Sequence, residues 1–185
     1  MHDLPTGFGE VSLAGFAEPR IEPEIVFGLA DAPASDMDDT HILGCIDWVA
    51  HGFEIVQSIY PGWKFAASDT VAACGLHAAL LIGPRHDVAS RRDEWRSTLG
   101  SFEIDLRCDG VTVDRGCAAN VLDGPVSTLR HLINILARDP DASSLAAGEI
   151  VTTGTLTRAL PIAPAQTWST VLRGIELPGL QLRFS

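Results

Sequence analysis

The stretch Pro19-Arg20-Ile21-Glu22-Pro23-Glu24-Ile25-Val26-Phe27-Gly28-Leu29 decides what kind of fold this chain adopts. From Ile21 onward its large apolar side chains fall mostly on every second residue, and this period of two is typical of a β-strand. Residues i and i+2 of a strand point to the same side, about 7 Å apart, so Glu22 and Glu24 share a face. Proline has no amide hydrogen to donate, so we expect Pro23 at a sheet edge, a strand start or a bulge.

The two glutamates form the first candidate site. Two like charges at this separation repel each other unless a cation bridges them or one carboxyl group stays protonated. Carboxylate oxygens suit Mg²⁺, Mn²⁺ or Ca²⁺ better than zinc or copper. Exposed glutamates two residues apart are also common without any ion, so the pair by itself leaves both a metal site and an ordinary surface pair open.

A third acidic residue, Glu54, follows in a segment that we predict to be a helix. Apolar residues recur there at spacings of four and three before Pro61-Gly62, namely Ile42, Ile46, Val49, Phe53 and Val56. Glu54 lies at the margin of this apolar face, where a carboxylate needs a metal ion, a basic partner or solvent. His51 would lie one helical turn before Glu54, where it could orient that carboxylate or compete with it as a ligand. We favour orientation over ligation, and an ordinary satisfied or exposed histidine over both.

The remaining segments favour an α+β domain with antiparallel or mixed sheets. Residues 71–82 are small and apolar, as in a buried strand or a tight turn followed by one. Residues 90–99 suit a short surface helix, and a longer helix starts at Pro125 and ends before Asp139-Pro140. Alternation around Asp109-Gly110 predicts a hairpin, and further strands are expected at 150–153, 167–172 and 180–184.

The charge pattern argues against two classes of partner. The 185-residue chain has a formal net charge of −11, and its cations are 12 arginines and the single lysine Lys64. The one basic cluster, Arg91-Arg92, is followed directly by Asp93-Glu94, which argues against nucleic acid. No apolar run approaches the ~20 residues that span a bilayer, and residues 1–10 lack a signal-peptide pattern. We therefore expect a cytoplasmic protein with no nucleic-acid or membrane partner.

With 46% hydrophobic residues, the chain can bury one sizeable core. Its cysteines indicate neither a disulfide framework nor a zinc ribbon, because no two of them form a Cys-x-x-Cys pair. We expect reduced and mostly buried thiols at Cys45, Cys74, Cys108 and Cys117.

Beyond the Glu-x-Glu stretch 19–29, four further motifs follow in order along the chain. They are Gly52-Phe53-Glu54-Ile55-Val56-Gln57-Ser58, Lys64 with Asp69-Thr70-Val71-Ala72, Gly148-Glu149-Ile150-Val151-Thr152-Thr153-Gly154-Thr155-Leu156-Thr157, and Leu180-Gln181-Leu182-Arg183-Phe184. Together these motifs resemble the C-terminal, metal-binding domain of the fumarylacetoacetate hydrolase superfamily. The resemblance is to the branch of 2-keto-4-pentenoate hydratase, 2-oxohepta-3-ene-1,7-dioate hydratase and 4-oxalocrotonate decarboxylase, and it covers residues 19–185.

The resemblance implies both a fold and a site. The fold would be a β-rich mixed β-roll or barrel with a few peripheral helices. Glu22, Glu24 and Glu54 would bind Mg²⁺ or Mn²⁺, which in the family chelates the 1-carboxylate and 2-oxo group of the substrate and stabilises an enolate. Lys64 would be the catalytic residue and would bind substrate, together with Thr153 and Gly154. A surface lysine and an ordinary tight turn are the alternatives for these positions.

The activity implied is that of a metal-dependent hydratase, a lyase acting on a 2-oxo or 2-hydroxydienoic acid in aromatic catabolism. A 2-oxo acid decarboxylase or a carbon–carbon hydrolase is the alternative among enzymes. The hydrolase ranks lower because it needs a histidine–carboxylate pair to activate water, and His51 is the only histidine near a candidate ligand. The third alternative is a catalytically silent metal-binding domain. We expect a small 2-oxo acid as substrate and a homo-oligomeric assembly.

Residues 1–18 are expected to be a short lead to a catalytic domain at 19–185. Family members carry a further region before the Glu-x-Glu strand, which is expected to supply a lysine and an acidic residue near the substrate. The 21 residues before Glu22 contain no lysine, and His2, Asp3 and Glu10 match no motif. We therefore expect metal binding to be retained better than turnover.

Overall fold

The computed structural model describes residues Met1–Ser185 and contains two mixed β-sheets. Sheet A runs in the order β1 (His2–Asp3), β5 (His77–Ile82), β4 (Ile46–Val56), β3 (Arg20–Leu29), β10 (Leu160–Pro161), with β6 (His86–Asp87) on β4 and β9 (Ile150–Thr152) on β3. Sheet B runs β2 (Phe8–Val11), β12 (Gln181–Phe184), β11 (Thr167–Arg173), β7 (Glu103–Cys108), β8 (Val111–Cys117). The pairs β1–β5 and β2–β12 are parallel, and the others are antiparallel. Residues 1–18 thus add one strand to each sheet.

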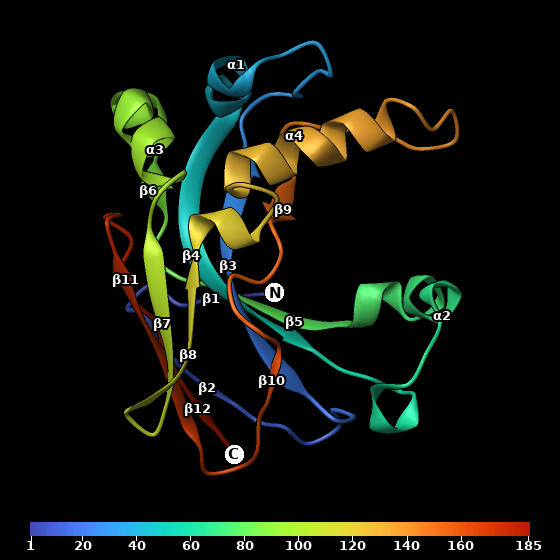
Figure 1. Ribbon diagram of the computed structural model, residues 1–185, viewed down its shortest axis with the longest axis vertical. Coiled ribbons are helices and arrows are strands. Elements are labelled where there is room, and N and C mark those ends of the chain that lie inside the picture. The colour runs from blue at the N-terminus through green and yellow to red at the C-terminus, as the bar shows by residue number, and fades with distance from the viewer.

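The helices are few and lie at the periphery. Helices α1 (Asp39–Gly44), α3 (Arg92–Thr98) and α4 (Pro125–Leu136) gather at one end of the sheets, whereas α2 (Ala67–Ala72) lies on a separate arm (Figure 1). Short 3₁₀ turns are η1 (Pro61–Trp63), η2 (Cys74–Leu76), η3 (Ala89–Arg91) and η4 (Ala118–Asn120). The expected α+β class with mixed sheets and few helices is confirmed. Neither sheet closes on itself, so the closed barrel is not confirmed.

The two sheets pack face to face across a buried cluster of 13 residues. In this cluster Ile21 and Phe53 of sheet A lie with Trp168, Leu182 and Phe184 of sheet B. A second cluster of 20 residues joins the sheets to α1, α3 and α4. None of the helices has the length and apolar character needed to cross a lipid bilayer.

Strand β3 lies inside sheet A, yet it accommodates a proline. On the side away from β4, β10 pairs with β3 at Ile21 and β9 pairs with it from Val26 onward, which leaves a gap at Pro23. The Pro23 carbonyl accepts a hydrogen bond from the Leu156 amide at 2.9 Å. The amide hydrogen that proline lacks is therefore not needed for a ladder bond, as expected at a local strand edge.

The helix predicted over residues 42–56 is wrong. Helix α1 ends at Gly44, and strand β4 begins at Ile46. β4 lies between β3 and β5 and is buried on both faces, so its apolar residues do not alternate with polar ones. Spacings of three and four then occur in a strand as easily as in a helix. Glu54 and His51 therefore lie on a strand.

Residues 71–82 do not form a strand throughout, which was one of the two alternatives. Strand β5 begins only at His77, so a turn followed by a strand is nearer to the structure. The preceding residues form α2 and η2 on the arm, where Val71 is 81% exposed. The arm projects away from both sheets, so its side chains have no second layer to pack against (Figure 1). Cys74 is exposed for the same reason, and the expectation that it is buried is wrong; among the four thiols, Cys45 is the buried one.

Other elements occur where the sequence predicts them. The β7–β8 hairpin turns at Asp109-Gly110, whose φ angles of 49° and 80° suit a two-residue type I′ turn. Helix α3 lies within 90–99, and α4 begins at Pro125 and ends ahead of Asp139-Pro140. Strands β9, β11 and β12 match the segments expected near the C-terminus.

Candidate metal centre

Three carboxylates converge on one face of sheet A. Glu22 and Glu24 lie two residues apart on β3, and Glu54 is the direct antiparallel partner of Glu22 on β4. Directly opposed residues project from the same face, so the pairing brings Glu54 to the other two. One carboxylate oxygen from each residue lies within 4.8 Å of the others. The sequence predicted this set, although it placed Glu54 on the wrong element.

Burial makes this cluster electrostatically unfavourable in the absence of a cation. Glu24 is only 1% exposed, and burial, followed by the charge of Glu54, raises the pKa of Glu24 to about 8. Burial and the charge of Glu54 also raise the pKa of Glu22 to about 7, against the opposing effect of Arg20. The cluster must therefore hold protons or a cation at neutral pH. An all-carboxylate set of hard oxygen donors fits Mg²⁺, Mn²⁺ or Ca²⁺.

The Thr153-Gly154 turn supports the cluster from the end of β9. The Gly154 amide donates to Glu24 Oε2 at 2.7 Å, and φ at Gly154 is +90°, a conformation that glycine adopts without strain. The amide and the hydroxyl of Thr153 both donate to the Ile25 carbonyl at 3.1 Å. Thr153 and Gly154, the two residues expected to bind substrate, thus donate these hydrogen bonds to β3. Their turn lies beside the carboxylate cluster.

His51 lies behind the cluster rather than beside Glu54. Its ring is buried, with Nδ1 2.9 Å from the Glu24 carbonyl and Nε2 2.9 Å from Thr170 Oγ1 on sheet B. Because the Leu180 amide donates to that same hydroxyl oxygen at 3.0 Å, the hydroxyl hydrogen is available for Nε2, and Nδ1–H donates to Glu24. Burial lowers the pKa of His51 to about 4, so the ring is neutral. His51 therefore does not orient Glu54, because residues 51 and 54 of β4 face opposite sides of the sheet. It is instead a buried histidine with both ring nitrogens hydrogen-bonded, in keeping with the satisfied histidine that we favoured.

A histidine that sequence reasoning missed contacts the cluster instead. His77 Nδ1 lies 2.7 Å from Glu54 Oε1. Strict alternation along 77–82 places His77 on the face of Ala79 and Leu81, which packs against sheet B. A register shift in the β4–β5 ladder changes this placement. No local pattern in the sequence signals that shift.

Lys64 lies on the exposed segment between η1 and α2, and no ion pair joins it to the three glutamates. The segment is anchored at its start, because the Trp63 indole donates to the Glu18 carbonyl at 3.0 Å and the Arg20 guanidinium lies 4.0 Å from the Trp63 ring centre. Asp69 accepts from the Ala66 amide at 2.8 Å and so caps α2. Lys64 thus belongs to an arm tied to the same end of β3 as Glu22.

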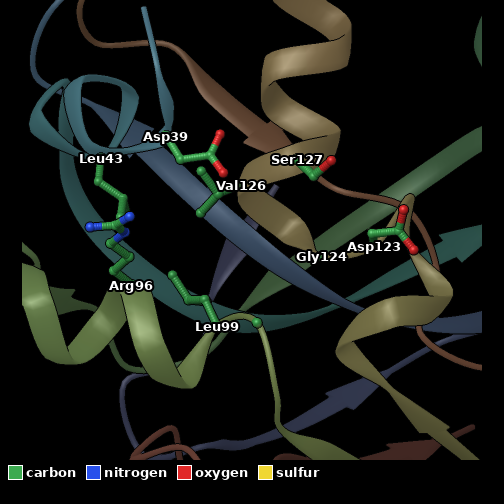
Figure 2. A pocket seen from close by; sticks show the side chains of 9 residues that line it. Asp39, Leu43, Arg96, Leu99, Asp123, Gly124, Val126 and Ser127 are labelled. Carbon is green, nitrogen blue, oxygen red and sulfur yellow. The ribbon is translucent and has the colours of Figure 1, made fainter.

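The hollow shown in Figure 2 is a separate feature. It has a volume of about 80 Å³ and lies among α1, α3 and α4, with Asp39, Arg96 and Ser127 among its polar lining residues. None of the three clustered glutamates lines it. Its walls carry both acidic and basic groups without a convergent donor set, so the carboxylate cluster remains the candidate site.

Comparison with known proteins finds curated relatives that match most of this chain. No protein-family model matches the chain. The 4-oxalocrotonate decarboxylase of a Pseudomonas species is 28% identical over 156 residues, which are 84% of this chain and 57% of that protein. The 2-hydroxyhexa-2,4-dienoate hydratase of Comamonas testosteroni is 28% identical over 169 residues, 91% of this chain and 61% of that protein.

The fold comparison agrees with the sequence comparison. The solved structure of 4-oxalocrotonate decarboxylase from Pseudomonas putida G7, complexed with magnesium and adipate, has a TM-score of 0.84 and 25% identity, and the match covers 99% of this chain and 66% of that one. The chain spans about three fifths of the length of the curated relatives that it matches. By sequence and by fold, the chain is similar to 4-oxalocrotonate decarboxylases and 2-keto-4-pentenoate hydratases.

Proposed function

We propose that Glu22, Glu24 and Glu54 hold one divalent cation and that the chain is the metal-binding part of a hydratase acting on a 2-oxo or 2-hydroxydienoic acid, as used in aromatic catabolism. The observation that carries the proposal is the convergence of three carboxylates within 4.8 Å. The raised pKa values of Glu22 and Glu24 add to it, since a cation is what relieves this repulsion.

Mg²⁺ or Mn²⁺ is the ion that we propose. The donor set contains only carboxylate oxygens, which are hard ligands. The relative from Pseudomonas putida G7 was solved both with magnesium and adipate and with calcium and acetate, which supports a divalent cation at this site without choosing between the two ions. When bound, such an ion supplies the positive charge that stabilises negative charge developing on the 2-oxo oxygen of the substrate.

The chain's own residues then have distinct tasks. We propose that Lys64, as the one lysine and an exposed group on the arm, closes onto the substrate carboxylate and exchanges a proton with the substrate. The arm is tied to Glu18 and Arg20, which keeps Lys64 at the end of β3 that carries Glu22. Thr153 and Gly154 form the adjoining wall of the substrate site, because their turn is bonded to Glu24 and Ile25.

Decarboxylation of a 2-oxo acid is the second candidate reaction. It is favoured by the similarity to a 4-oxalocrotonate decarboxylase and draws on the same stabilisation of negative charge. A carbon–carbon hydrolase is the third candidate among enzymes. His51 is neutral, buried and bonded on both ring nitrogens, so it is unsuited to activate water. The histidine–carboxylate pair at the cluster is His77 with Glu54, and we assign that carboxylate to the metal. A silent metal-binding domain remains the alternative without turnover. The closed roll and the homo-oligomer of the family are also part of the proposal.

One binding measurement and two product assays test these alternatives. Titration calorimetry with Mg²⁺ should give one site per chain that is lost or strongly weakened in Glu24→Gln. Incubation with Mg²⁺ and 2-hydroxypenta-2,4-dienoate should give a hydrated product, whereas release of CO₂ from 4-oxalocrotonate would favour the decarboxylase. Metal binding without either product would favour the silent domain. A chain that binds no divalent cation at all would contradict the proposal.

A further inference from the structure

His77 contacts one of the proposed ligands from outside the strand pair that carries them. Its Nδ1 donates to Glu54 Oε1 at 2.7 Å. The His77 side chain is 46% exposed and that of Glu54 is 15% exposed, so the bond lies at the rim of the cluster. A histidine–carboxylate pair with this exposure contributes little to the stability of the fold.

An irregularity in β5 aims His77 at this carboxylate. Ala79 follows the regular register of the β4–β5 ladder, but the next pair is Val56 with His77, so Ala78 is skipped. In regular alternation from Ala79, His77 would lie on the face that packs against sheet B. The skipped residue moves His77 to the opposite face, where Glu54 lies. Bulges that redirect a side chain in this way are frequent beside functional sites.

Glu24, a second proposed ligand, also accepts a hydrogen bond from an N–H group. Glu24 Oε2 accepts from the Gly154 amide at 2.7 Å, as Glu54 Oε1 accepts from His77. In both carboxylates one oxygen already accepts an N–H hydrogen bond, which makes the other oxygen the freer donor for a cation. Mg²⁺ binds carboxylates in this one-oxygen manner with strict octahedral geometry, whereas Ca²⁺ takes 6–8 oxygens and often uses both oxygens of a carboxylate.

We propose that His77 is a positioning residue that restricts Glu54 to binding through one oxygen and thereby makes the site favour Mg²⁺ over Ca²⁺. The inference rests on the proposed metal function of the three glutamates. Without His77, the Glu54 carboxylate is able to rotate and coordinate through both oxygens. This bidentate binding suits Ca²⁺ but not Mg²⁺. Loss of His77 should therefore change the ratio of the Mg²⁺ and Ca²⁺ affinities and leave the stability of the fold nearly unchanged.

The test compares Mg²⁺ and Ca²⁺ affinities by titration calorimetry for the wild type, His77→Ala and His77→Asn. The pH is set above the pKa values of Glu22 and Glu24, about 7 and about 8, so that protons do not compete with the ions. Asparagine places an amide N–H close to the position of Nδ1. The control is His41→Ala, because His41 Nδ1 also lies 2.8 Å from a carboxylate, Asp38, on the exposed end of α1.

His77→Ala is expected to weaken Mg²⁺ binding about tenfold or more, the usual range for a lost partner of a metal ligand, and Ca²⁺ binding much less. His77→Asn should restore most of the ratio, and His41→Ala should leave it unchanged. If the wild type binds Mg²⁺ and His77→Ala has the same ratio of Mg²⁺ to Ca²⁺ affinity as the wild type, this inference is overturned and the proposed function stays intact. A wild type that binds neither ion would overturn both.

Discussion

Glu22 and Glu54 face each other directly across the antiparallel β3–β4 ladder. Like charges opposed in this way destabilise a sheet, and here they lie beside a third carboxylate, Glu24, which is buried. The three carboxylates repel one another when they are ionised, and a divalent cation bound between them would replace that repulsion by attraction to the ion.

Replacing Glu22 by glutamine should weaken metal binding by at least about tenfold and leave the fold intact. The change removes one anion from a mutually repelling set, so the metal-free protein should also melt at a higher temperature. Calorimetric titration and thermal melts measure the two effects. Glu10→Gln, at an exposed glutamate on β2, is the matched control and should alter neither. An unchanged affinity in Glu22→Gln, or an unfolded protein, would count against the metal role.

Metal affinity should rise with pH and level off in the alkaline range. The pKa of Glu22 is raised to about 7 and that of Glu24 to about 8, mainly by burial. Below these values the ion must displace protons, so affinity should increase from about pH 6 to about pH 9 and then stay constant. Titration in two buffers of different ionisation enthalpy gives the number of protons released. An affinity that is flat across this range would contradict the shifted pKa values.

The same shifts give the metal-free protein an opposite pH dependence of stability. Both folded-state pKa values lie above the ordinary value of 4.5. The folded protein holds these protons more tightly than the unfolded chain does. Their contribution to the free energy of unfolding is therefore complete below pH 4.5 and is lost as pH rises through about 7 to about 8. Denaturant unfolding in the presence of a chelator should give a lower free energy of unfolding at alkaline pH than at mildly acidic pH. The slope should be smaller in Glu24→Gln; an equal slope would argue against the buried carboxylate as its source.

Gly154→Ala should lower both stability and metal affinity. At φ of +90° an added Cβ meets only Val121 at 3.8 Å, so the cost is backbone strain rather than crowding, about 1 kcal/mol or more. The backbone would relax to relieve that strain and would move the residue 154 amide away from the Glu24 carboxylate that it now bonds. Gly148→Ala is the control, because Gly148 has a φ of +85° and no nearby atoms. Both variants should melt lower, but only Gly154→Ala should bind Mg²⁺ more weakly, as measured by calorimetry.

His51→Gln should remove an acid-sensitive component of stability. Burial lowers the pKa of His51 to about 4 in the folded protein, from an ordinary 6.5. A group with a depressed pKa adds stability above its ordinary value, and this is lost as pH falls toward 4, by about 1.4 kcal/mol per pH unit. The stability difference between wild type and variant should therefore shrink over that window in denaturant unfolding. A constant difference would indicate that His51 is not protonated on unfolding.

Several features of this protein follow from the sequence alone because they depend on neighbours along the chain. The period of two over 19–29 places Glu22 and Glu24 on one face whatever the strand pairs with. Asp109-Gly110 supplies the positive φ angles of a tight hairpin, and Pro125 starts a helix. The oxygen-only ligand set, and hence the class of ion proposed, also follows from residue types and their spacing.

The tertiary structure decided what depends on pairing between distant segments. A strand buried on both faces has no alternation of polar and apolar residues to distinguish it from a helix. Only pairing with β3 and β5 makes residues 46–56 a strand. The β3–β4 register, and not spacing along the chain, places Glu54 opposite Glu22. A skipped residue in β5 turns His77 toward Glu54, and the turn after β9 brings the Gly154 amide to Glu24. Local periodicity fixes which face a side chain takes, but hydrogen bonding between strands far apart in the sequence fixes which side chains meet on it.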